Sequence, residues 1–128
     1  LKPQTFMNKS GEAVSEAAAF YKIPTENIIV ICDDVNFDAG AMRIRKKGSD
    51  AGQRGVRSII EHMNSDAFPR IKMGVGKKPS PDYDMADWVL SKFSKEEEIK
   101  LYAAIENAYD AVMLMLSGKT EQAMSKYN

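Results

Sequence analysis

An unbroken apolar run over residues 28–32, IIVIC, constrains the fold of this chain more than any other stretch. The run is too short for a helix and is rich in β-branched residues, so it predicts a strand that is buried on both faces. It stops at two carboxylates, Asp33 and Asp34. Because loops diverge at the carboxyl ends of strands in an open α/β sheet and leave a crevice there, this pair is the first candidate for a functional site.

The segments around this run predict further strands and helices. Residues 1–8 are expected to end a strand, and the apolar spacing over 13–21 is typical of a helix, so these two segments and the run form a strand–helix–strand unit with parallel strands. Alternation and helical spacing predict three more elements: a strand over 41–47, a helix over 53–64 and a half-exposed strand over 68–76. The sequence therefore indicates an α/β domain.

The last third of the chain predicts mainly helices. Residues 77–84 contain two prolines without apolar periodicity and are expected to form a loop that could serve as a flap, before a helical turn over 85–90. Ser94 and Glu97 form a capping box for a long helix that ends near residue 116. We expect its apolar stripe to pack on the sheet; the stripe consists of Ile99, Tyr102, Ala103, Ile105, Tyr109, Val112, Met113 and Leu116.

Length and composition limit the class of protein. The 128 residues suit a single domain, 1–128, and the formal net charge is zero. Cys32 is the only cysteine, so no intrachain disulfide can form, and neither a membrane span nor a signal peptide is visible; a cytoplasmic protein is expected. The chain does not begin with Met, and its first residues look like the middle of a domain, so we expect a fragment.

Several candidate residues have two interpretations. Asp33 after a strand can cap a turn or serve a site, and the aspartate pair lacks the further ligands that a divalent metal would need. Arg43, Arg45 and Lys46 form either a solvated face or a phosphate-binding patch. His62, the only histidine, lies late in a predicted helix, where a structural role is favoured over that of a general base.

Several motifs together resemble bacterial peptidyl-tRNA hydrolases. KPQTFMNKSG over residues 2–11 is similar to the family's KPxTFMNxSG segment. IIVICDDVNFDAGAMRIRKKGS over 28–49 resembles its strand, aspartate, turn and basic strand, and GQRGVRSII over 52–60 resembles its GHNGLKSII helix start. FPRIKMGVGKKP and DWVLSKF follow in the expected order. The resemblance covers nearly the whole chain.

The resemblance implies a fold, an activity and a set of site residues. The fold would be a three-layer domain with a mixed, mainly parallel sheet flanked by helices, in an N-terminally truncated form. The activity would be hydrolysis of the ester between peptide and tRNA by a monomer that needs no cofactor and no metal. Asp33 would orient the catalytic histidine, and Asn8 would hold substrate and water beside it. Residues 77–85 would form the flap over the cleft.

Binding roles follow from the same resemblance. Met7 would line the cleft with Asn8, and Gln53 and Arg54 would contact the substrate. The tRNA would be bound by four cations: Arg43, Arg45, Lys46 and Arg54.

Two departures from the family pattern accompany these assignments. The family's catalytic histidine belongs to an N-terminal region that has no counterpart here, and His62 does not match it. The histidine and asparagine of the family's GHNG are Gln53 and Arg54 in this chain. A guanidinium group cannot accept a hydrogen bond, so it cannot replace the asparagine amide fully. The alternative hypothesis is therefore an RNA-binding protein on the same scaffold that has no catalytic activity.

Overall fold

The computed structural model describes all residues from 1 to 128. Its regular elements are η1 (Met7–Lys9), α1 (Ser10–Tyr21), η2 (Thr25–Asn27), β1 (Val30–Asp34), β2 (Met42–Arg45), α2 (Arg54–Met63), β3 (Arg70–Gly74), α3 (Met85–Val89), α4 (Lys95–Leu116) and α5 (Thr120–Tyr127). None of the helices is long and apolar enough to span a membrane.

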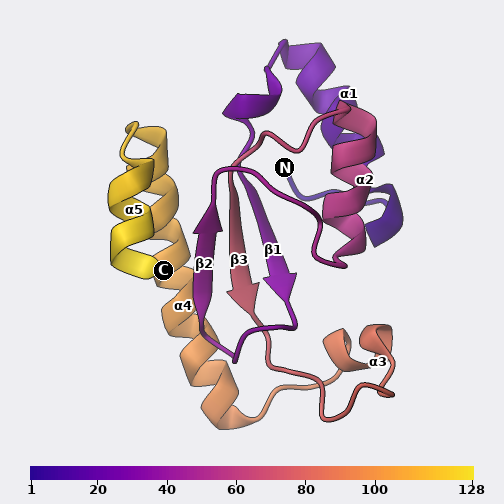
Figure 1. The fold of residues 1–128 in the computed structure, drawn as a ribbon, viewed down its shortest axis with the longest axis vertical. Helices are drawn as coiled ribbons and strands as arrows, with labels where there is room; N and C mark the ends of the chain where they lie inside the picture. The colour runs from indigo at the N-terminus through magenta and orange to yellow at the C-terminus, as the bar shows by residue number, and fades with distance from the viewer. The chain divides into compact units, whose positions relative to one another are not determined.

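The three strands form one sheet in the order β1-β3-β2. Val30 N–H donates to the Pro69 carbonyl at 3.0 Å and Val75 N–H to the Asp34 carbonyl at 3.2 Å, so β1 and β3 are parallel. Gly74 N–H donates to the Ala41 carbonyl at 2.8 Å, and β2 runs against β3, as the arrows in Figure 1 show. The predicted α/β fold with a mixed sheet flanked by helices is confirmed.

Two expectations about the strands are wrong. Residues 1–8 form no strand, since the sheet consists of β1, β3 and β2 and these residues pair with none of them. Met7 and Asn8 begin η1 instead. The apolar run is also not buried on both faces, since Ile31 is 52 % exposed. The run shows that a strand is favoured, but β1 lies at an edge of the sheet and a continuous apolar pattern does not say which of its faces is covered.

The residues divide into two compact units, which are described separately. The first comprises residues 1–32 and 45–70, and the second comprises 33–44 and 71–128. In the first unit, Val56 and Ile59 of α2 and the buried Phe68 form a core. Partly buried apolar residues pack against this core: Val14, Ile28, Val30, Cys32, Ile60 and Met63.

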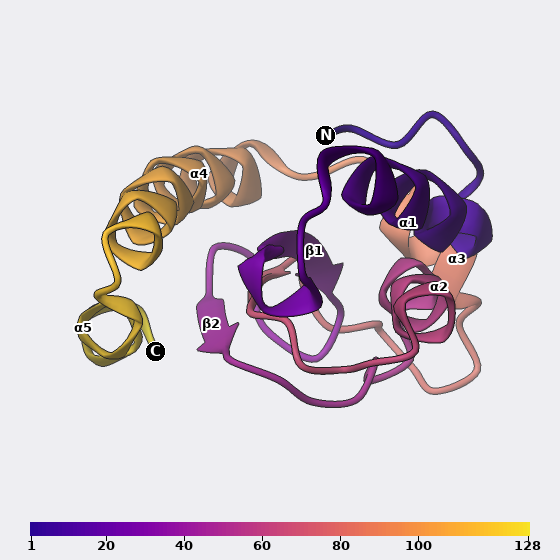
Figure 2. The same cartoon turned by 90° about the horizontal axis from the view of Figure 1, so that it is seen from above.

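Helices α1 and α2 lie side by side in the first unit (Figure 2). Gly11 N–H donates to the Ser58 hydroxyl at 2.9 Å in the buried contact between them. A Cβ at Gly11 would lie only 2.1 Å from the Ser58 carbonyl oxygen. Glycine is therefore what allows the two helices to approach so closely.

In the second unit, α4 and α5 form a helical hairpin. The predicted capping box of α4 is present, with Ser94 Oγ accepting from Glu97 N–H at 3.2 Å. The turn after α4 uses Gly118 at φ +76°, a conformation that favours glycine. At the far end of α5, the Asn128 amide exchanges hydrogen bonds with both backbone groups of Ile44 and so completes the pairing of β2.

The predicted packing of the apolar stripe of α4 on the sheet is wrong. Its bulky members remain exposed: Ile99, Tyr102, Ile105, Tyr109, Met113 and Leu116. The buried residues of α4 are Ala104, Ala108, Ala111 and Met115. The helix carries two apolar faces, and the one with small side chains is buried because it permits closer approach of the backbone.

Candidate functional site

The first part of the candidate site is the contact between η1 and the start of α2. The Met7 sulfur lies 3.6 Å from Gln53 Nε2, which donates to it, and 3.9 Å from the Ser10 hydroxyl. Gly55 is packed against the same sulfur, since a Cβ there would lie 2.7 Å from it. Asn8, next to Met7 in η1, is exposed. The structure therefore brings three of the predicted residues, Met7, Asn8 and Gln53, into one region.

Gln53 is the N-cap residue of α2. Its Oε1 accepts from Val56 N–H at 2.8 Å, which satisfies one of the free donors at the helix start. The same amide donates to Met7, so Gln53 links the cap to η1. Its role in substrate binding stays a prediction, but the sequence did not reveal that this side chain also shapes the site.

Arg54 is the first residue of α2 and is exposed, and no ion pair involves its side chain. The guanidinium group lies at the positive end of the helix dipole, which repels it weakly. The first turn of α2 contains no acidic residue that would offset this repulsion. Arg57 is in a different position, because it forms an ion pair with Asp50 at 3.2 Å. An unpaired cation at a helix N-terminus is poised to attract an anion.

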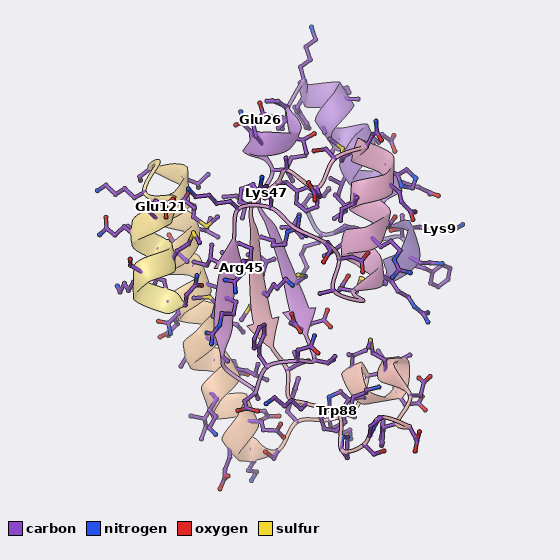
Figure 3. All side chains as sticks on the ribbon, in the orientation of Figure 1. Lys9, Glu26, Arg45, Lys47, Trp88 and Glu121 are labelled. Carbon is purple, nitrogen blue, oxygen red and sulfur yellow. The ribbon has the colours of Figure 1, made fainter.

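The other predicted tRNA-binding cations come from β2 and the residues after it. In the second unit, Arg43 lies over the Phe37 ring at 5.2 Å from the centroid and donates to the Met42 carbonyl at 2.9 Å. In the first unit, Arg45 and Lys46 are exposed. Figure 3 shows Arg45 on β2 and Lys47 just beyond the strand. The alternation predicted for this strand is confirmed, since Met42 and Ile44 are buried.

The two aspartates at the end of β1 have different environments. Asp34 is buried and accepts from both the backbone N–H and the side-chain amide of Asn36, each at 2.8 Å. Its second oxygen pairs with Lys72 at 3.5 Å. Asp34 is thus a structural residue that holds the turn after β1, whereas Asp33 is only partly buried. Adjacent carboxylates in the sequence gave no signal that would separate these roles.

The only histidine serves its own helix. His62 Nδ1 donates to the Ser58 carbonyl at 2.8 Å, within the last turns of α2. This contact agrees with the structural role that its position in the sequence favoured. No group of three or more histidine, cysteine, aspartate or glutamate side chains is arranged to hold a metal ion.

The segment predicted as a flap is folded onto itself in the second unit. The Lys78 ammonium group donates to the carbonyls of Pro81 and Tyr83 at 3.3 and 3.2 Å. Tyr83 meets the ring of Trp88 edge to face at 5.8 Å, and the Trp88 indole N–H donates to the Gly76 carbonyl at 2.8 Å. Trp88, labelled in Figure 3, therefore ties α3 back to the end of β3.

Comparison with known proteins decides the family. A family model described as peptidyl-tRNA hydrolase matches residues 1–128. The chain belongs to the peptidyl-tRNA hydrolase family. A peptidyl-tRNA hydrolase from Agathobacter rectalis is 50 % identical over 129 residues, which cover 100 % of this chain and 69 % of the relative. One from Thermoanaerobacter sp. is 51 % identical and is covered to 68 % of its length.

Solved structures of the family have the same fold. The crystal structure of peptidyl-tRNA hydrolase from Acinetobacter baumannii matches 98 % of this chain with a TM-score of 0.91 and 32 % sequence identity. A crystal structure of a peptidyl-tRNA hydrolase in complex with N-propanol matches equally well. The chain spans 63 % of the length of each of these structures.

The site residues predicted for this member of the family fall in both compact units. Six belong to the first unit: Met7, Asn8, Arg45, Lys46, Gln53 and Arg54. Asp33 and Arg43 belong to the second. Their assignment to catalysis and binding rests on the motif resemblance and remains a prediction.

Proposed function

We propose that this protein hydrolyses the ester bond between the peptide and the tRNA of peptidyl-tRNA. The observation that carries the proposal is the family match over all 128 residues, together with relatives that are about half identical and are named for this activity. The relatives and structures reported above are named as hydrolases, which favours catalysis over a purely RNA-binding role.

The proposed chemistry is attack of an activated water on the ester carbonyl. In the family, a histidine takes the proton from water, and the resemblance assigns the aspartate that orients it to Asp33. A carboxylate that accepts from one ring nitrogen fixes the tautomer and stabilises the imidazolium that forms. Asn8, exposed in η1, would hold the water and the carbonyl oxygen through its amide, which can both donate and accept. The reaction is proposed to need neither metal nor cofactor.

The tRNA would be held mainly through its phosphates. Arg54 is exposed and unpaired at the start of α2, and Arg45 and Lys46, which precede it in the chain, are exposed as well. Guanidinium groups match phosphate oxygens in geometry and charge. The zero net charge of the chain makes a local patch, rather than the whole surface, the source of attraction.

An ester-release assay on a model peptidyl-tRNA tests the activity. It compares the 128-residue chain with the same chain extended at its N-terminus by the preceding segment of the Agathobacter rectalis relative. We expect turnover in the extended protein, because the family places the water-activating histidine in that segment. No ester release from the extended protein, with tRNA binding intact, would instead favour the RNA-binding alternative.

Asp33→Ala in the extended protein tests the orienting carboxylate. We expect kcat to fall at least about tenfold, because general-base catalysis contributes that much or more, with little change in tRNA affinity. Asp38→Ala is the matched control, since Asp38 is an exposed carboxylate in the same segment. Unchanged turnover in Asp33→Ala would remove Asp33 from the mechanism.

We also propose that the protein acts as a monomer in the cytoplasm and that residues 1–128 belong to one domain. Light scattering on a size-exclusion column tests the first of these, and a single coincident unfolding transition by two probes tests the last. A dimer at micromolar concentration or two separate transitions would contradict them.

A further inference from the structure

The alternating pattern of residues 68–76 predicted a half-exposed strand. Arg70, at the start of β3, is instead a charged residue whose side chain is fully buried. Nη1 donates to the Ser49 carbonyl at 3.0 Å and Nη2 to the Asp66 carbonyl at 2.8 Å. The guanidinium group also lies 4.3 Å from the centroid of the Phe68 ring, while its Nε has no partner. Burial lowers the pKa of Arg70.

The Ser49 carbonyl belongs to the loop that leads into α2. This loop is tightly wound, because Ala51 and Gly52 have successive positive φ angles of 49° and 86°. Within it, the Asp50 carboxylate accepts from Gly52 N–H at 2.7 Å, and the Asp50 carbonyl accepts from Gln53 N–H at 3.0 Å. A shift of Ser49 would therefore be passed through this turn to Gln53, the residue that caps α2.

We propose that Arg70 is a positioning residue for tRNA binding, which acts by fixing the loop over residues 48–53 and thereby the direction of Arg54. The inference rests on the proposed function, since Arg54 is assigned there to a tRNA phosphate. Arg70 itself is buried and touches no substrate. All of these residues, from Ser49 to Arg70, belong to the first unit.

The geometry calls for arginine rather than any cation. Two nitrogens of one planar group reach two carbonyls that are 17 residues apart in the chain, Ser49 and Asp66. Lysine has one nitrogen on a flexible stem and cannot hold both carbonyls in the same fixed plane. An apolar residue would fill the space but leave the carbonyls without donors, which is costly in a buried site.

Arg70→Lys tests the proposal because it keeps the charge and most of the side-chain volume. We expect the amides of Gly52 and Gln53 to exchange hydrogen at least about tenfold faster than in the parent, with the amides of α1 unchanged. We also expect the Kd for tRNA to rise about three- to tenfold and the slope of log K against log salt to fall by about one, although the net charge is unchanged. A general loss of charge does not explain this fall in the salt slope, because Arg70→Lys keeps the charge. A loss of stability alone does not predict a lower salt slope either.

A double-mutant cycle with Arg54→Gln shows whether Arg70 acts through Arg54. Arg54→Gln alone should lower the salt slope by about one, and the double variant should lower it no further. If the salt slope of the double variant fell by about one more than that of Arg54→Gln, the proposal would be overturned. Hydrogen exchange that is faster in α1 to the same extent as in the loop would overturn it as well. An unchanged loop and slope in Arg70→Lys would overturn it too.

Arg57→Lys is the matched control, because it makes the same change in an arginine of α2 whose side chain is 56 % exposed and pairs with Asp50 of the same loop. An effect on Kd equal to that of Arg70→Lys would contradict a special role for the buried group. If the parent chain shows no salt-dependent tRNA binding, the proposed function fails. The exchange of the Gly52 and Gln53 amides still decides in that case whether Arg70 positions the loop.

Discussion

Gly11→Ala tests the close contact between α1 and α2 in the first unit. The added Cβ would lie 2.1 Å from the Ser58 carbonyl oxygen, 2.4 Å from its carbon and 2.6 Å from His62 Nδ1. Ordinary van der Waals contact begins near 3.4 Å, so α1 and α2 must separate by about 1.3 Å, the difference between 3.4 and 2.1. The oxygen belongs to the backbone of α2 and cannot rotate away, and the Gly11–Ser58 hydrogen bond would be lost.

The expected cost is about 2–4 kcal/mol, the sum of overpacking and a lost buried hydrogen bond, less the gain in helix propensity from glycine to alanine. For a chain of this length, Tm should fall by roughly 6–20 °C in thermal unfolding followed by circular dichroism. Ser58→Ala is the control, because it removes the hydrogen bond without a clash and should cost about 1–2 kcal/mol. A Tm for Gly11→Ala within about 2 °C of the parent would refute the close contact.

Three further predictions concern the site and its loop. Arg43→Gln with Arg45→Gln should lower the salt slope of tRNA binding by up to about two, whereas the exposed Lys119→Gln should leave it unchanged; equal slopes in the three proteins would count against the patch. Gln53→Leu should cost about 0.5–2 kcal/mol through the lost cap, while Gln53→Glu keeps the acceptor and should retain the parent's stability in urea unfolding; equal losses would contradict the capping role. Hydrogen bonds from Arg57 and from Gly52 N–H hold the pKa of Asp50 below its usual value, so its contribution to the loop is present above about pH 4 and is lost as pH falls through the lowered pKa. Amide exchange in the loop should show this loss as pH falls below about 4 in the parent but not in Asp50→Asn, and identical profiles would exclude the effect.

The sequence predicted the elements with a strong local signal. The Ser94–Glu97 capping box appears at the start of α4, and helical spacing identified α2 to within about one residue at each end. These signals are local because a cap and an amphipathic helix depend on residues within a few positions of each other. The mixed sheet followed less directly, from the order of the elements and the family resemblance.

The errors arose where the answer depends on distant partners. The bulky stripe of α4 and the alanine face opposite were both apolar, and only packing decides which is buried. Arg70 was expected in an alternating, half-exposed strand, but the carbonyls that make its burial possible come from Ser49 and Asp66, in other segments. Similarly, nothing within the Asp33-Asp34 pair indicated that Lys72 would take the second of them.

The departure from the family's GHNG segment acquires a physical meaning from these contacts. A neutral imidazole that caps a helix with one nitrogen has one N–H left on the opposite side of the ring, whereas the Gln53 amide presents its acceptor and donor side by side. It can therefore accept from Val56 N–H and donate to Met7 with one short side chain. Arg54 has no comparable local partner and repels the helix dipole, so local stability does not explain its presence. Arg54 follows the loop that Arg70 holds through the Ser49 carbonyl, and an anion bound by Arg54 would explain a cation at this position. The change in the salt slope of tRNA binding in Arg54→Gln measures whether Arg54 binds such an anion.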